Sequence, residues 1–311
     1  IKEHSEIKDG EHTGVNVSIR GRILNARSFG KLLFYDLLDQ SGKIQLLINS
    51  GEIDELYLKL FDNFDIGDII AVNGEIIKTK KGELSIKVNE TTILSKSLRT
   101  LPEKWHGLKD KETRFRQRYL DLIVNPESKR ILQTRSNVVR LLREYLHATE
   151  FIEVETPILQ SKAGGAIAKP FQTHHNALNL DMYLRIAPEL YLKRLVIGGF
   201  EKVFEIGKIF RNEGIDQTHQ PEFTMLESYQ AYADMNIVMD MVEDMCEYVF
   251  DNLEINKEIE FNGEQASFSR PWKRVSMYDL VSEKFGIEIN FNTGFEAVSY
   301  THLTLPTSSR V

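Results

Sequence analysis

The stretch Phe223-Thr-Met-Leu-Glu-Ser-Tyr229 predicts a β-strand with two different faces. Side chains alternate across a strand, so Phe223, Met225, Glu227 and Tyr229 share one face. An acid beside two aromatic rings and a methionine is unusual in a core strand. Either this face is exposed to solvent, or it is a pocket floor where the carboxylate of Glu227 and the phenol of Tyr229 accept an ammonium group.

A second polar cluster, Phe210-Arg-Asn-Glu213, ends the preceding predicted strand. In extended backbone, Arg211 and Glu213 point to the same side. A guanidinium can hold a phosphate or a carboxylate with two parallel hydrogen bonds, and a carboxylate can accept from an adenine amine or a ribose hydroxyl. An ordinary surface ion pair has the same sequence pattern.

The glycine pair in Ala163-Gly-Gly-Ala166 permits a close approach of backbone to a ligand, although a plain turn has the same pattern. No Gly-Lys-Ser or Gly-Lys-Thr follows it, so this is not a phosphate-binding loop of that type. His174 and His175 are adjacent and point to opposite sides of a strand, which argues against a shared metal ion.

Around these clusters, predicted strands outnumber helices and come in adjacent pairs. This pattern predicts a mainly antiparallel sheet flanked by helices. The expected helices are 127–149, 189–197 after Pro188, and one that follows the N-cap Asp234; the expected strands are 151–157, 182–187, 203–211 and 222–231.

The N-terminal part predicts a separate small β-barrel. Three strands, a helix and two strands follow one another, which is the order of an OB-fold, whose second and third strands and adjoining loops bind oligonucleotides. The chain is therefore expected to be α+β, with a barrel followed by a sheet-based domain. The expected strands of the barrel are 15–26, 32–38, 43–48, 69–78 and 83–88, with the helix at 53–64.

Composition limits the possible classes of protein. A chain of 311 residues is long enough for two domains with cores, and 27% charged residues argue against disorder. The net charge of −7 argues against a protein that coats nucleic acid non-specifically. Residues 15–35 contain four cationic side chains and no acidic one, which fits either a local RNA-binding patch or a solvated face. Because Cys246 is the one cysteine of the sequence, an intrachain disulfide is excluded and a reducing cytosol is indicated. No apolar run is long enough to span a bilayer.

Together these stretches resemble class II lysyl-tRNA synthetases of the bacterial type, over residues 15–290. In that family, motif one is a helix and strand that end at Pro157 and build a dimer interface, and motif two is the strand, loop and strand of residues 203–232. The matching motifs include Arg114-Phe-Arg-Gln-Arg-Tyr-Leu-Asp-Leu122, Phe151-Ile-Glu-Val-Glu-Thr-Pro157, Gly164-Gly-Ala-Ile-Ala-Lys-Pro-Phe171, Tyr183-Leu-Arg-Ile-Ala-Pro-Glu-Leu-Tyr-Leu-Lys-Arg194, Phe210-Arg-Asn-Glu-Gly214 and Pro221-Glu-Phe-Thr-Met-Leu-Glu227.

The resemblance implies an ATP site in motif two. Arg211 is expected to bind the α-phosphate of ATP and the amino-acid carboxylate. Glu213 is expected to contact adenine, and Phe223 to stack on it. His219 is expected to lie in the motif-two loop near the phosphates. The implied catalytic residues are thus Arg211, Glu213 and His219.

The resemblance also implies a lysine site and an RNA site. Glu189 and the backbone of Gly165 are expected to hold the α-amine of lysine, while Glu227 and Tyr229 face its ε-ammonium. Four residues of the barrel match positions that the family uses to read a uridine-rich anticodon: Arg27, Phe34, Gln45 and Glu83.

The implied function is that of a cytoplasmic, homodimeric lysine–tRNA ligase. It activates lysine with ATP and Mg²⁺ to lysyl-adenylate and then transfers the lysyl group to tRNA(Lys). The family's magnesium ligands and its motif three find no match in this chain, so we assign no metal ligand and expect the chain to be inactive alone.

The expected domains follow from the same comparison. We expect a shortened lead-in at 1–14, an OB-fold anticodon-binding domain at 15–97, a linker at 98–126 and a partial catalytic domain at 127–297. Residues 298–311 resemble translated sequencing-adapter read-through, and we expect them to be a non-native tail.

Two other functions share parts of this pattern. An aspartyl- or asparaginyl-type synthetase has both domains but needs a basic side chain in its amino-acid pocket, whereas Glu189 and Glu227 favour a cationic substrate. A non-catalytic tRNA-binding relative is the other alternative. The intact motif-two residues argue against it for the parent gene, but not for this fragment.

Overall fold

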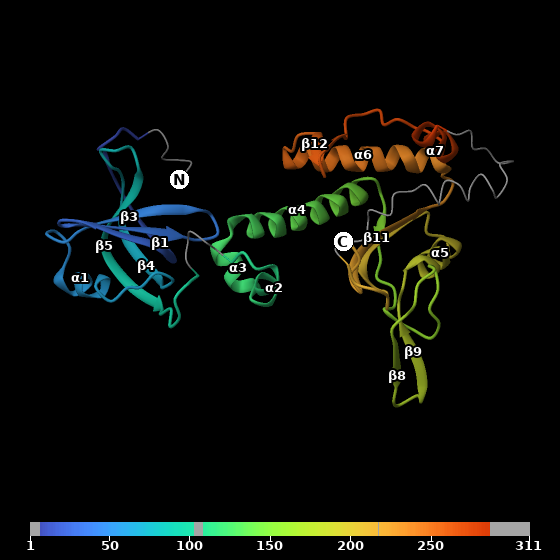
Figure 1. The fold of residues 1–311 in the computed structure, drawn as a ribbon, viewed down its shortest axis with the longest axis horizontal. Coiled ribbons are helices and arrows are strands. Elements are labelled where there is room, and N and C mark those ends of the chain that lie inside the picture. Colours follow the sequence, from blue (N-terminus) through green and yellow to red (C-terminus); the bar gives the residue numbers. More distant parts are fainter. Residues whose placement is uncertain (1–6, 103–107, 217, 287–311) are drawn as a thin grey trace. The chain divides into compact units, whose positions relative to one another are not determined.

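A computed structural model describes residues 7–102, 108–216 and 218–286 of the chain. The chain divides into two compact units after Ile131, and each unit is considered by itself. Figure 1 shows the first unit in blue to green and the second in green to red. The expected lead-in lies partly outside the described residues, and the expected tail lies wholly outside them.

The first unit contains the predicted barrel. The strand pairing runs β1-β2-β3-β5-β4 and closes through β4 and β1. All pairs are antiparallel except β3 with β5, which is parallel. The predicted order of three strands, a helix and two strands is therefore confirmed. The elements are β1 His12–Phe29, β2 Leu32–Leu38, β3 Lys43–Asn49, α1 Glu55–Phe61, β4 Ile69–Lys78 and β5 Leu84–Ser95.

Alternation of side chains along the strands fills this barrel. Ile23, Leu46, Ile48 and Ile70 are completely buried inside it, and Phe61 of α1 packs against the same core. The opposite side chains of β1, β2 and β3 face outward because the strand period is two. The fold therefore presents one continuous outer surface across these three strands.

The expected linker contains two short helices that the sequence patterns did not predict, α2 Lys111–Arg116 and α3 Arg118–Val124. Both are organised by Asp121, whose side chain is fully buried. Its carboxylate accepts from Arg114 Nε at 2.8 Å, from Arg118 Nη1 at 2.6 Å and from Asn125 Nδ2 at 2.6 Å. Polar side-chain contacts between residues three to seven positions apart, rather than an apolar stripe, hold these helices, so hydrophobic periodicity could not find them.

The second unit is built around two small three-stranded sheets, in the orders β11-β10-β6 and β7-β9-β8. A β12-β13 hairpin follows the long helix α6, in orange in Figure 1. The elements are α4 Pro126–Ala148, which begins before the division between the units, then β6 Ile152–Glu153, β7 Leu159–Gln160, β8 Gln172–His175, β9 Leu180–Leu184, α5 Glu189–Ile197, β10 Lys202–Phe210, β11 Glu222–Gln230, α6 Met235–Leu253, β12 Glu258–Phe261, β13 Glu264–Ser267 and α7 Met277–Phe285.

Helices α4 and α6 pack on one face of the β10–β11 pair. Leu146 of α4 and Phe204 of β10 are completely buried there, and Leu226 of β11 and Met241 of α6 pack against them. Asp234 caps α6 as predicted, because its carboxylate accepts from the backbone of Asn236 and Ile237 at 2.9 and 3.0 Å. The opposite face of the strands is left for the polar side chains discussed below.

The barrel strands β1 and β5 are longer than predicted, and in the second unit two predicted strands differ by more than one residue at an end. The strand expected at 151–157 is paired only at Ile152 and Glu153, where it runs parallel to β10, and the backbone leaves the sheet before Pro157. The strand expected at 182–187 begins earlier and ends at Leu184, so that Arg185 lies just beyond it. Across the described residues, no helix is long and apolar enough to cross a membrane.

Candidate functional site

Strand β11 has the face that the alternating pattern of residues 223–229 predicts. Strands β10 and β11 pair over nine consecutive residues without a bulge, so Phe223, Met225, Glu227 and Tyr229 do share one face. Each is half-buried. Across the ladder, Glu205 of β10 stands directly opposite Glu227. The face therefore places two carboxylates side by side at the centre of the sheet.

Glu227 and Tyr229 form a hydrogen-bonded pair on this face. The phenol of Tyr229 donates to Glu227 Oε2 at 3.0 Å. Burial raises the pKa of the Glu227 carboxyl, the hydrogen bond from Tyr229 opposes this rise, and the nearby charges of Glu189 and Glu205 add to it. Burial and the negative charge of Glu227 likewise raise the pKa of Tyr229. Both groups would gain from an incoming cation.

Glu189 and Gly165 lie together beside this pair. Glu189 is the first residue of α5, and its carboxylate pairs with Lys193 Nζ at 2.5 Å. Gly165 has a positive φ of 87°, and a Cβ placed on it would lie 3.0 Å from Glu189 Cβ and 3.2 Å from Ala187 Cβ. Glycine is therefore required for this close approach, and its backbone is held against the start of α5.

Arg211 follows the last residue of β10 and contacts a predicted stacking residue. Its guanidinium carbon lies 5.2 Å from the centre of the Phe223 ring. Among the described residues, Arg211 Nε is the one buried side-chain polar atom without a hydrogen-bond partner. A buried donor left unpaired is costly, so an anion that accepts from Arg211 would be bound favourably.

The backbone around Glu213 corrects one expectation. Residues 211–213 are not an extended strand, because the backbone N–H of Glu213 donates to the carbonyl of Arg211 at 3.0 Å and turns the chain. Glu213 instead faces the 163–171 segment, where the backbone N–H of Lys169 donates to its carboxylate at 3.3 Å. The prediction of a shared face for Arg211 and Glu213 by strand alternation was wrong.

His219 lies in the exposed loop between β10 and β11. Its Nδ1 atom is 2.8 Å from Asp216 Oδ2. Hydrogen bonds from the backbone of Thr218 and from His219 hold the pKa of the Asp216 carboxyl well below its usual range. Asp216 thus organises this loop, and the His219 ring is held by Asp216 and by the Thr218 hydroxyl at 3.1 Å.

Sequence reasoning missed a buried ion pair beneath this site, Arg185 with Glu205. Thr156 completes it, since its hydroxyl donates to Glu205 Oε2 at 2.6 Å and its carbonyl accepts from Arg185 Nη1 at 3.2 Å. One feature of the sequence could have indicated this pair: Arg185 and Glu205 are each a charged residue inside an apolar run, at 183–187 and 203–206. Period two applied to β10 places Glu205 on the same face as Val203 and Gly207, but its position opposite Glu227 also depends on the register of the ladder.

The barrel brings Arg27 and Phe34 together on its outer surface, where they are direct partners in the β1–β2 ladder. Arg27 Nη2 lies 3.3 Å from Asp36 Oδ1, so this buried acid fixes the guanidinium over the second strand. Phe34 meets the exposed ring of Phe29 edge-on, with 6.1 Å between the ring centres. Stacking and positive charge are the features that hold single-stranded RNA.

Gln45 lies on the same outer surface, on β3, beside the fully buried Ser85 of β5. The Ser85 hydroxyl donates to Gln45 Oε1 at 3.0 Å, which leaves the amide N–H groups to face solvent. Glu83 is exposed in the β4–β5 turn, where its backbone N–H donates to Thr79 Oγ1 at 3.0 Å. Three of the four predicted RNA-reading side chains therefore lie on β1, β2 and β3, and the fourth lies at the adjoining turn.

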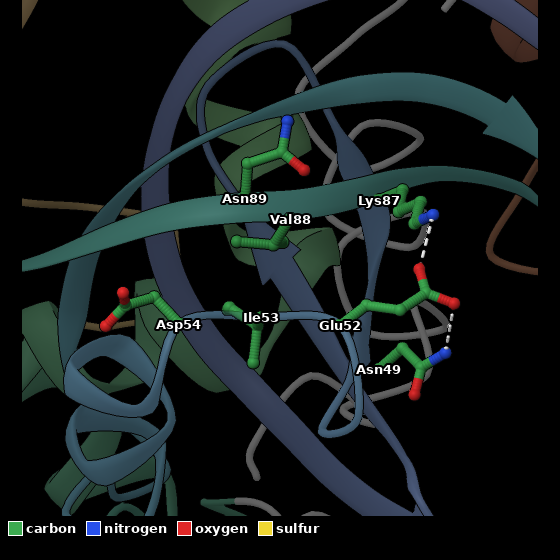
Figure 2. A pocket seen from close by; sticks show the side chains of 7 residues that line it. All are labelled: Asn49, Glu52, Ile53, Asp54, Lys87, Val88 and Asn89. Atoms are coloured by element: carbon green, nitrogen blue, oxygen red, sulfur yellow. Dashed lines mark hydrogen bonds and ion pairs between the residues drawn. The ribbon is translucent and has the colours of Figure 1, made fainter.

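Figure 2 shows a pocket of about 260 Å³ on the barrel, next to the loop between β3 and α1. Lys87 Nζ pairs with Glu52 Oε2 at 2.6 Å, and Asn49 donates to Glu52 Oε1 at 2.7 Å. The hydrogen bond from Lys87 lowers the pKa of the Glu52 carboxyl. Both carboxylate oxygens are thus already paired. The lining residues are Asn49, Glu52, Ile53, Asp54, Lys87, Val88 and Asn89.

Magnesium is implied by the family resemblance, but the described residues do not fit it. In residues 7–102, 108–216 and 218–286, no group of three or more His, Cys, Asp or Glu side chains could hold a metal ion. No metal ligand is therefore assigned among these residues.

Comparison with known proteins identifies both units by sequence. Residues 17–94 match the OB-fold nucleic acid binding domain, which confirms the predicted barrel. Residues 110–299 match the family described as tRNA synthetases class II (D, K and N), which confirms the predicted α+β fold.

Several similar proteins are named lysine–tRNA ligase. The chain is 50% identical to one from Clostridium botulinum strain Hall over 290 residues, covering 93% of this chain and 57% of that protein. It is also 50% identical to one from Clostridium tetani, covering 92% of this chain and 56% of that protein, and to one from Clostridium perfringens strain SM101, covering 92% and 58%. The chain thus spans little more than half the length of these relatives. With a family match over residues 110–299, it belongs to the class II tRNA synthetases of the D, K and N group.

Proposed function

We propose that this chain is part of a lysine–tRNA ligase, which activates lysine with ATP and transfers it to tRNA(Lys). The observation that carries the proposal is the acidic amino-acid site. Glu227, hydrogen-bonded to Tyr229, and Glu189, at the start of α5, act electrostatically on one another. Lysine carries two ammonium groups, and two carboxylates on one side of a sheet match that charge. The relatives named lysine–tRNA ligase support the same assignment.

In this proposal, Glu227 and Tyr229 accept the ε-ammonium of lysine. Glu189 and the backbone of Gly165 hold its α-amine. Burial is what makes the pocket selective, because a ligand without the terminal ammonium leaves the Glu227 carboxylate desolvated and unpaired.

Arg211 is proposed to bind the carboxylate of lysine and the α-phosphate of ATP. Its buried, unpaired Nε fits a group that is satisfied only when an anion arrives. The lysine carboxylate attacks the α-phosphorus in line, which forms the mixed anhydride and expels pyrophosphate. Holding both reactants on one guanidinium supplies orientation and stabilises the developing negative charge.

Three further residues are proposed to complete the nucleotide site. Phe223 offers a ring for the adenine base, Glu213 offers a carboxylate for its amine, and His219 lies on the loop that would cover the phosphates.

The barrel is proposed to read the anticodon of tRNA(Lys). Arg27, Phe34, Gln45 and Glu83 provide charge, stacking and hydrogen-bonding groups on one surface and its adjoining turn. A cytoplasmic location is part of the same proposal, because aminoacylation serves translation. Dimerisation through motif one is also part of it, on the basis of the family resemblance.

Isothermal titration of the chain with lysine and with norleucine, which lacks the ε-ammonium, tests the substrate. We expect lysine to bind at least about tenfold more tightly, because norleucine leaves the half-buried carboxylate of Glu227 without a cation. Glu227→Gln should remove this preference. The matched control is Glu222→Gln, on the same strand but exposed and paired with Lys208. Equal affinities for lysine and norleucine in the unsubstituted chain would contradict the proposal.

Aspartate and asparagine belong in the same titration, since the matched family covers those specificities too. An acidic substrate would meet Glu189 and Glu227 with like charge, so we expect no detectable binding of aspartate. Binding of aspartate in preference to lysine would favour the aspartyl-type alternative.

A further inference from the structure

The buried ion pair of Arg185 and Glu205 lies on the proposed substrate face but has no part in the proposed chemistry. Arg185 is 2% exposed and Glu205 is 3% exposed. Glu205 stands directly opposite Glu227 in the β10–β11 ladder. Side chains opposed in this way have Cβ atoms about 5 Å apart, so the two carboxylates are close neighbours.

Two carboxylates this close in a partly buried place cannot both stay ionised unless a cation compensates one of them. Arg185 is that cation, since its Nη1 atom contacts Glu205 Oε1 directly. Arg185 Nε donates to the Lys208 carbonyl at 2.8 Å, which anchors the guanidinium to the strand that carries Glu205. Thr156 donates to the other oxygen of Glu205, so both oxygens are already paired within the protein.

The backbone of β10 is shaped to admit this guanidinium. A Cβ placed on Gly207 would lie 2.2 Å from Arg185 Nη2, which is far inside van der Waals contact. Gly207 belongs to the same strand face as Glu205, two residues further along. The arginine therefore occupies the space that a side chain at position 207 would fill, immediately beside both glutamates.

We propose that Arg185 is a positioning residue that neutralises Glu205 and thereby leaves Glu227 as the free negative charge of this face. The proposal deepens the proposed function and rests on it for the identity of the ligand, the ε-ammonium of lysine. In this arrangement one glutamate is structural and its neighbour binds substrate, although both lie on the same face.

The electrostatics of Glu227 agree with this division. Besides burial, the groups that act on it are Tyr229 from its own strand, Glu205 from β10, Glu189 from α5, and Arg185 from beyond β9. Glu189 and Glu205 raise the pKa of the Glu227 carboxyl, whereas Arg185 lowers it. Removing either member of the buried pair should therefore move the pKa of Glu227, in opposite directions.

The experiment is a ¹³C NMR titration of the Glu227 carboxyl in the full chain without ligand. Arg185→Met should raise its titration midpoint by about one unit or more, because Glu205 is then uncompensated. Glu205→Gln should lower the midpoint, because Arg185 is then free to act on Glu227. The double variant Arg185→Met with Glu205→Gln should return the midpoint close to that of the unsubstituted chain.

Thr156→Val is the matched control, because it removes a hydrogen bond from the pair without changing any charge; its midpoint should move less than either charge variant. If Arg185→Met does not fold, Glu205→Gln and the double variant still decide the matter. A midpoint that does not fall in Glu205→Gln, in a folded protein, would overturn the proposal.

Titration with lysine and norleucine separates this proposal from the function on which it rests. If the midpoints shift as expected and Glu205→Gln still prefers lysine over norleucine, the role of Arg185 and the proposed substrate are both supported. If the midpoints shift but the unsubstituted chain shows no preference, the charge arrangement holds and the substrate assignment fails.

Discussion

At the scale of single residues, Tyr229 controls how readily Glu227 ionises. The phenol donates to the carboxylate and so lowers a pKa that burial raises. Tyr229→Phe should therefore raise the pKa of Glu227 further. Lysine binds the ionised form of Glu227. As the pH is lowered, Tyr229→Phe should therefore lose its affinity for lysine at a higher pH than the unsubstituted chain does.

The pH dependence of lysine binding, measured by titration calorimetry, checks this prediction. Tyr232→Phe is a suitable control, because Tyr232 lies just beyond β11 and is 91% exposed. A profile that is the same in Tyr229→Phe and in the unsubstituted chain would show that the hydrogen bond has no such effect.

Single residues also show how far sequence reasoning reached. The alternation in 223–229 predicted the face of Glu227 and Tyr229 because a strand without bulges obeys a strict period of two. The partner Arg185 could not be found in this way. It lies just past the end of β9, and only the tertiary fold brings it over Gly207. Glu213 was misplaced because a turn after Phe210 ends the alternation.

At the scale of elements, Asp121 holds α2 and α3 together and is the clearest target for acid destabilisation. Burial alone would raise its pKa, but hydrogen bonds from Asn125, Arg114, Ser128 and Arg118 outweigh that effect and hold the pKa far below its usual range. When folding lowers the pKa of a carboxyl, its contribution to stability is complete at a pH above its pKa in the unfolded chain, about 3.9. That contribution is lost as the pH falls through its lower pKa in the folded protein.

Asp121→Asn should therefore destabilise the chain by roughly 2 to 3 kcal/mol at neutral pH, because the charge-assisted hydrogen bonds of a buried acceptor are lost. It should also flatten the acid limb of the stability curve below about pH 4. Urea unfolding between pH 3 and pH 7 measures both effects. Asp110→Asn provides a comparison, since this acid caps α2 at the surface.

Helix α6 depends on its cap in the same local way. Asp234→Ala should lower the thermal unfolding midpoint, because the backbone N–H groups of Asn236 and Ile237 lose their acceptor. Asp234→Ser keeps an acceptor and should recover most of this loss. Thermal unfolding measures the difference, and equal stability of the two variants would show that the cap contributes little.

Elements differ in how well the sequence predicts them. Helix α6 and the barrel strands have long periodic patterns and clear turn or cap residues, and they were found. Strand β6 keeps only two paired residues, opposite Val203 and Phe204 of β10. Beyond them, Thr156 donates its backbone N–H and its hydroxyl to the side chain of Glu205 instead of continuing the ladder. That contact depends on the tertiary fold, so no pattern within 151–157 could have revealed it.

At the scale of the whole molecule, recognition of an anticodon stem-loop should be a property of the barrel. Titration of the chain with a uridine-rich stem-loop should shift NMR signals of Phe34 and Gln45. Phe34→Ala should weaken binding about tenfold or more, because stacking contributes about 1 to 3 kcal/mol per base. Phe115→Ala is the matched control, as this ring is 70% exposed on α2. Unchanged affinity in Phe34→Ala would contradict the prediction.

The unbroken ladder between β10 and β11 has a consequence for how the second unit tolerates change. Leu226 and Phe204 on one face pack against helices, while Glu227 and Glu205 on the other face line the site. An inserted or deleted residue in β11 would exchange these faces, burying acids among apolar helices and turning Leu226 toward the ligand. Insertions and deletions should therefore be far more damaging in this strand than most substitutions, and a library of single-codon deletions should show a sharp minimum of folded protein across residues 222–230.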